Sequence, residues 1–76
     1  MSLWRKLHEL PNGAIFITKD NILAVKSEYY YPNGNCQCVL LESGEYGHFP
    51  NGSDEPVLEI SLQEIKNLAM VHKLFA

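Results

Sequence analysis

The sequence has only two cysteines, Cys36 and Cys38, and it lacks a Cys-x-x-Cys pair. It also lacks a glycine-rich phosphate-binding motif and a Gly-x-Ser-x-Gly motif. These absences remove the sequence signals for a zinc knuckle, a nucleotide-binding loop and a hydrolase nucleophile elbow. A chain of 76 residues is small, and domains of that size bury only about 60% of their unfolded surface. We therefore predict a single domain over residues 1–76 that is not an enzyme and holds no cofactor.

Long apolar runs are missing as well. No segment approaches the roughly 20 apolar residues that span a bilayer. The N-terminus does not show the charged, apolar and small-residue succession of a secretory signal. We expect a cytoplasmic protein without membrane partners.

Basic residues are absent from a long part of the second half. The stretch from Glu42 to Ile65 has no Lys or Arg, while the chain carries a net charge of −3. Its carboxylates are Glu42, Glu45, Asp54, Glu55, Glu59 and Glu64. This distribution argues against a phosphate-binding surface there. It indicates a solvated acidic rim or, alternatively, a surface for a basic protein partner.

Two turn signals predict consecutive hairpins. Asp20-Asn21 separates two β-branched runs, and a two-residue turn there would place Phe16 opposite Val25. Asn33-Gly34 as a two-residue turn would place Tyr31 opposite Cys36 and Tyr29 opposite Cys38. Both turns then put one set of residues on a common core face: Phe16, Leu23, Val25, Tyr29, Tyr31, Cys36, Cys38 and Leu40. Ile15, Ile17 and Ala24 fall on the opposite face, so the first strand is apolar on both sides and one of its faces needs a cover.

The remaining segments complete a small fold. Residues 1–11 read as a leading helix or turn, residues 14–60 as an antiparallel meander, and residues 61–75 as a C-terminal helix. Ser61 and Glu64 fit a capping box at the start of that helix. Its apolar stripe comprises Leu62, Ile65, Leu68, Ala69, His72 and Phe75, broadened by Met70, Val71 and Leu74. The predicted class is α+β, mainly β: a strongly bent antiparallel sheet or a partly open SH3-like barrel of about five strands with a C-terminal α-helix.

Cys36, Cys38 and His48 are the candidates for a metal-dependent or thiol-dependent site. The two cysteines share one predicted strand face, and a histidine from the next strand would supply a third ligand. A zinc site normally has four ligands, and the chain shows no established ligand spacing. The more ordinary interpretation is that both cysteines are small core residues.

Tyr30 is predicted on the outward sheet face near Lys26, where an exposed ring would serve single-stranded nucleic acid as a stacking platform. The net acidity makes this a weaker alternative. The main expectation is a small non-enzymatic protein-interaction or self-association module. The residues expected to contact a protein partner or a second copy are Tyr30, Met70, Val71 and Leu74, because the helix has more apolar surface than a lone helix keeps in water.

Overall fold

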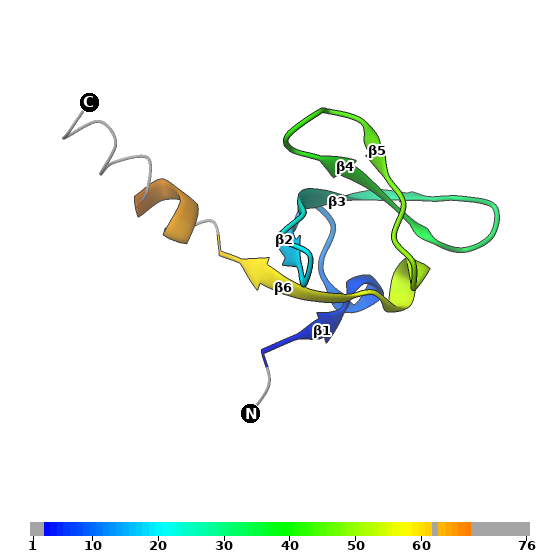
Figure 1. Cartoon of the computed structure of the whole chain (residues 1–76), viewed down its shortest axis with the longest axis horizontal. Coiled ribbons are helices and arrows are strands. Elements are labelled where there is room, and N and C mark those ends of the chain that lie inside the picture. The colour runs from blue at the N-terminus through cyan, green and yellow to red at the C-terminus, as the bar shows by residue number, and fades with distance from the viewer. Residues whose placement is uncertain (1–2, 62, 68–76) are drawn as a thin grey trace.

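The computed structural model describes residues 3–61 and 63–67, and these form one antiparallel sheet of six strands (Figure 1). The elements in chain order are β1 (Arg5–Lys6), the 3-10 helix η1 (Leu7–Glu9), β2 (Ile15–Thr18), β3 (Leu23–Tyr30), β4 (Cys36–Leu40), β5 (Tyr46–Gly47), the 3-10 helix η2 (Gly52–Asp54) and β6 (Pro56–Ile60). Residues 63–67 form a short helix. The prediction of a small, mainly β antiparallel fold is confirmed.

The strand order across the sheet is β1-β6-β2-β3-β4-β5. Strands β2 to β5 follow one another as in the predicted meander, whereas β6 returns to the far side and pairs with β2 and β1. The sheet does not close, because β1 and β5 form its two edges. The leading segment contains the predicted turn as η1, and it also contributes β1, which the sequence pattern did not indicate.

The first hairpin differs from the predicted register by one residue. Phe16 lies opposite Ala24, not Val25. The loop has three residues because the Asn21 N–H donates to the Thr18 carbonyl (3.0 Å) and Asn21 adopts a positive φ of 65°. A left-handed residue at the third loop position is typical of this hairpin class.

The second hairpin also differs from its predicted register by one residue. Tyr30, not Tyr31, lies opposite Cys36, because the loop again has three residues and ends on Gly34 at φ 89°. The Gly34 N–H donates to the Tyr31 carbonyl (2.8 Å). Pro32 explains the choice, since its fixed φ suits the second position of a type I turn and is incompatible with a tight turn of positive φ.

Strand β3 also has a bulge. The register shifts between Lys26 and Tyr30, so that Lys26 and not Tyr29 lies opposite Cys38. The Tyr29 N–H turns to the Ser27 hydroxyl (3.1 Å). Tyr29 is 63% exposed as a result and takes no part in the core.

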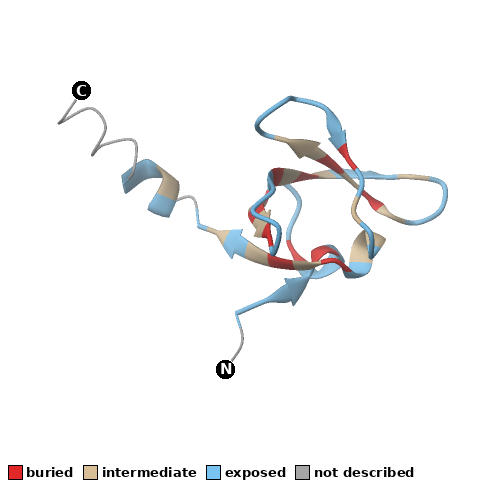
Figure 2. Ribbon diagram, in the orientation of Figure 1, coloured by how far each residue is buried: buried red, intermediate tan, exposed pale blue. Residues whose placement is uncertain are grey.

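These register changes alter the core face. Phe16, Cys36 and Cys38 are buried as predicted, but Leu23 and Tyr29 are exposed and Ala24 is fully buried. The buried apolar residues are Leu7, Leu10, Ala14, Phe16, Ala24, Cys36, Cys38 and Val57 (Figure 2). The cover for this face comes from η1 and the segment before β2, with Leu7 donating its N–H to the Glu55 carbonyl (3.0 Å).

Lys26 is a buried charged residue, only 2% exposed. Its Nζ donates to Asn12 Oδ1 (2.9 Å) and lies 5.5 Å from the centre of the Tyr30 ring. The hydrogen bond and the aromatic face offset part of the cost of removing an ammonium from water. Lys26 therefore belongs to the core and not to an outward face.

The capping box predicted at Ser61 is present, next to the short helix over residues 63–67. The Glu64 N–H donates to Ser61 Oγ (3.1 Å), and the Ser61 N–H donates to the Glu64 carboxylate (2.8 Å), which together form the capping box. Most of the predicted helix, including Met70, Val71 and Leu74, lies outside the described residues. Among the described residues, no helix has the length and apolar content to cross a membrane.

The loop geometry predicts different effects of two substitutions on the free energy of unfolding. Gly34→Ala forces a Cβ into the left-handed region and is expected to lower the free energy of unfolding by about 1–2 kcal/mol, whereas Asn21→Gly keeps or slightly raises it. Urea denaturation measures both. Equal stability of Gly34→Ala and wild type would contradict the three-residue loop.

The hydrogen bond between Lys26 and Asn12 predicts that substitutions at these two residues have non-additive effects on the free energy of unfolding. Asn12→Ala leaves the buried ammonium without its acceptor and is expected to cost about 1–3 kcal/mol. Lys26→Met removes the charge, so adding Asn12→Ala to it should cost little further. Denaturation of both single variants and the double variant gives the coupling; additive losses would show that the hydrogen bond contributes nothing.

Candidate functional site

The sheet face opposite the core is apolar across five strands. Antiparallel pairing sets Ile15 beside Val25 and Ile60, and it continues the row through Val39 to Tyr46. A second row runs beside it from Leu58 through Ile17 and Leu23 to Leu41. We call this surface the outer face: Ile15, Ile17, Leu23, Val25, Val39, Leu41, Tyr46, Leu58 and Ile60.

None of the outer-face residues is buried. Leu41 is 46% exposed and Tyr46 is 61% exposed. The described turn of the C-terminal helix leaves the end of β6 and does not lie over the sheet (Figure 1). Contiguous apolar surface of this kind marks interaction sites on small proteins. The sequence predicted that one face of the first strand needs a cover, and in the structure the outer face is the face of β2 that is not buried.

A groove lies at the β6 side of the outer face. It has a volume of about 490 Å³, and its apolar lining comes from Leu3, Leu58 and Ile60. Glu59 and Glu64 bring two carboxylates to it. The groove therefore combines an apolar lining with negative charge.

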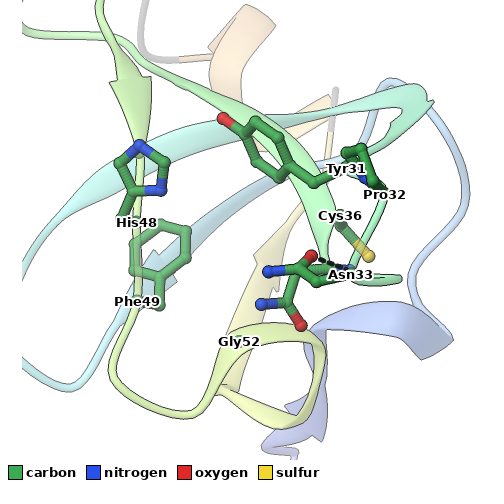
Figure 3. Close-up of a pocket in the computed structure, with 9 residues that line it drawn as sticks. Tyr31, Pro32, Asn33, Cys36, His48, Phe49 and Gly52 are labelled. Atoms are coloured by element: carbon green, nitrogen blue, oxygen red, sulfur yellow. Dashed lines mark hydrogen bonds between the residues drawn. The ribbon is translucent and has the colours of Figure 1, made fainter.

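A separate pocket lies between the β3–β4 loop and the segment after β5 (Figure 3). Its volume is about 380 Å³. The lining residues are Tyr31, Pro32, Asn33, Asn35, Cys36, Gly47, His48, Phe49 and Gly52. The structure thus brings Cys36 and His48 to one pocket, whereas Cys38 is buried and does not line it.

Aromatic rings form one wall of this pocket. Tyr31 stacks on His48 with ring centroids 5.5 Å apart and an interplanar angle of 28°. Phe49 meets the core ring of Phe16 edge-on at 5.9 Å. The Phe49 contact anchors this side of the pocket to the core.

Hydrogen bonds hold the opposite side of the pocket. The Cys36 N–H donates to Ser53 Oγ (3.0 Å), and Ser53 Oγ donates to the Gly34 carbonyl (3.2 Å). Gly52 lies so close to Asn35 that an added Cβ would collide with the Asn35 amide. These contacts tie the β3–β4 loop to η2.

The Cys38 thiol is held in its neutral form. Burial and the neighbouring Cys36 together raise the pKa of Cys38 to about 11, although Lys26 partly opposes this shift. A neutral thiol is a poor nucleophile and metal ligand. Within residues 3–61 and 63–67, no three His, Cys, Asp or Glu side chains gather as a metal site would require. Both cysteines are free and buried, as packed core residues are.

Tyr30 lies on the face of Cys36, at the margin of the core, and not on the outer face. It is 52% exposed, and Lys26 is held beneath its ring. The predicted pairing of an exposed Tyr30 with an exposed Lys26 for nucleic acid is therefore not present.

Sequence reasoning missed the outer face as a continuous surface and the pocket as a site. The outer face follows from the one-residue register difference, which moves Leu23 and Val25 out of the core. The signal for the pocket was Pro32, because a type I turn at Tyr31-Pro32-Asn33-Gly34 leaves Asn33 free to bond the Asn35 N–H (3.0 Å).

The raised pKa of Cys38 predicts a pH-dependent stability. The native thiol keeps its proton between pH 9.0 and about 11, where the unfolded thiol ionises. The stabilisation is fully present below pH 9.0 and is lost as the pH rises toward 11. The difference in unfolding free energy between wild type and Cys38→Ala should therefore decrease over that range. A constant difference would contradict the shift.

No protein-family model, no curated protein and no solved structure matches this chain, so its function is argued from its own residues.

Proposed function

We propose that this chain is a non-enzymatic self-association module in which a second copy covers the outer face. The observation that carries the proposal is the pair of apolar rows, one of which crosses five strands, with no covering element among the described residues. Removing such surface from water is favourable by about 25 cal/mol per Å². A chain this small gains much of its total stability from one such interface.

The C-terminal segment of the second copy is the proposed occupant. Ser61 follows β6 directly and caps the helix, so the described turn is directed beyond the sheet (Figure 1). Ile65 is half-buried and shares a pocket with Ile15 and Ile60, which makes the apolar surface continuous from the sheet onto the helix. Met70, Val71 and Leu74 are the predicted contact residues further along.

Charge supports the same occupant. Glu59 and Glu64 line the groove beside the outer face, and the C-terminal segment carries Lys66 and Lys73. Opposite charges at the rim of an apolar contact guide register and exclude wrong partners. Tyr30, exposed at the margin of the sheet, is proposed as an additional contact residue.

The partly open SH3-like barrel, the full C-terminal helix and the cytoplasmic location stay predictions. In the proposed dimer, the C-terminal helix of the second copy docks on the open six-stranded sheet and covers its outer face.

The test is the absolute mass in solution, measured by light scattering over a range of concentrations. Wild type is expected to be a dimer or larger. Leu41→Lys places a charge on the outer face and is expected to give a folded monomer. Ser43→Lys adds the same charge in the neighbouring exposed turn and should remain associated.

Two results would overturn this proposal. A wild type that is monomeric at all concentrations excludes the second copy and leaves a protein of different sequence as the partner. A Leu41→Lys variant with wild-type mass would place the interface away from the outer face.

A further inference from the structure

The pocket of Figure 3 has hydrogen-bond donors without partners beside its aromatic wall. Asn33 Oδ1 accepts from the Asn35 N–H (3.0 Å), and Asn35 Oδ1 accepts from the Ser53 N–H (3.3 Å). Both amide oxygens are therefore committed to backbone donors, which fixes how each amide is turned. The two Nδ2 groups have no hydrogen-bond partner among the described residues.

Asn33 and Asn35 both line the pocket. Figure 3 shows the Asn33 amide nitrogen turned toward the side where Phe49 and His48 lie. The Tyr31 hydroxyl is buried and also has no partner in the described part of the chain. A buried polar atom without a partner is uncommon, so the Tyr31 hydroxyl favours a ligand that satisfies it. Asn33 is exposed and Asn35 is half-buried, so their Nδ2 groups are accessible to an incoming acceptor.

The rest of the lining limits the chemistry of a ligand. No Asp, Glu, Lys or Arg lines the pocket, so no fixed charge is available to bind an ion. Tyr31, His48, Phe49 and Pro32 supply flat or apolar surfaces. A volume of about 380 Å³ falls at the small end of the range for ligand sites.

We infer that this pocket binds a neutral, flat apolar group that carries a carbonyl acceptor. The ring packs against the Tyr31–His48 stack and Phe49, and the carbonyl accepts from the free amide groups of Asn33 and Asn35. The pocket lining shares no residue with the outer face, so ligand binding is tested separately from self-association. The same chemistry is present in a small aromatic ketone and in an aromatic residue of a peptide.

The experiment is a titration of the isotope-labelled full chain followed by NMR. Acetophenone is the small-molecule probe, and N-acetylphenylalanine amide represents the peptide source. Aniline is the control, because it has a similar ring whose amino group chiefly donates. Acetophenone is expected to bind in the millimolar range and to shift the side-chain amide signals of Asn33 and Asn35. The Asn67 side-chain amide, on the helix, should not move.

Asn33→Asp tests the donor directly. The substitution keeps an oxygen acceptor for the Asn35 N–H and removes the Nδ2 donor, so the loop should be retained while acetophenone binds about fivefold more weakly. Asn67→Asp makes the same change away from the pocket and should bind like wild type. The amide spectrum shows whether each variant is folded.

If N-acetylphenylalanine amide binds more tightly than acetophenone, the ligand of the pocket is an aromatic residue of a peptide. If acetophenone binds more tightly, the ligand is a free small molecule. Unmoved Asn33 and Asn35 signals at the solubility limit of both probes would overturn the inference. Equal binding of aniline and acetophenone, or wild-type affinity in folded Asn33→Asp, would also overturn it.

Discussion

The left-handed residue at the third position of each of the first two hairpin loops determines which side of every strand meets the core. Asn21 and Gly34 hold that conformation, and each loop has three residues as a result. Side chains alternate along a strand, so a one-residue difference in register exchanges the two faces. The identity of the core, the buried Lys26 and the outer face all depend on these two positions.

One consequence is that the core contains few large apolar side chains. Phe16 is its only fully buried aromatic side chain in the described residues, and the neighbouring strand positions hold Ala24, Lys26 and Cys38. On β2 to β4, Ile15, Ile17, Leu23, Val25 and Val39 lie on the outer face instead, whereas the core receives Leu7, Leu10 and Val57 from other segments. A small domain that places so much apolar surface outside its own core has a strong reason to associate. The proposed function depends on this distribution and on no single side chain.

Local sequence signals identified individual strands and the capping box well, because each of these depends on residues close together in the sequence. The capping box of Ser61 and Glu64 needs only residues three apart, and the β-branched run before Asp20 forms a strand in any register. Register was harder, because the Asn33-Gly34 dipeptide favours a tight turn while Pro32 before it favours a type I turn, and the proline prevails. The β3 bulge and the return of β6 depend on contacts between distant segments, such as Leu7 with Glu55, that no local pattern specifies. Pro32 indicated the turn on one side of the pocket, but the pocket as a whole could not be predicted, since it joins the β3–β4 loop to the segment after β5.

Cross-strand NMR contacts test the register most directly. The structure predicts backbone contacts between Ile15 and Val25, and between Ile17 and Leu23, across the first hairpin. These contacts would place Ile15 and Val25 together on the outer face, as the account requires. Contacts between Phe16 and Val25, and between Thr18 and Leu23, would contradict it and return Val25 to the face of Phe16.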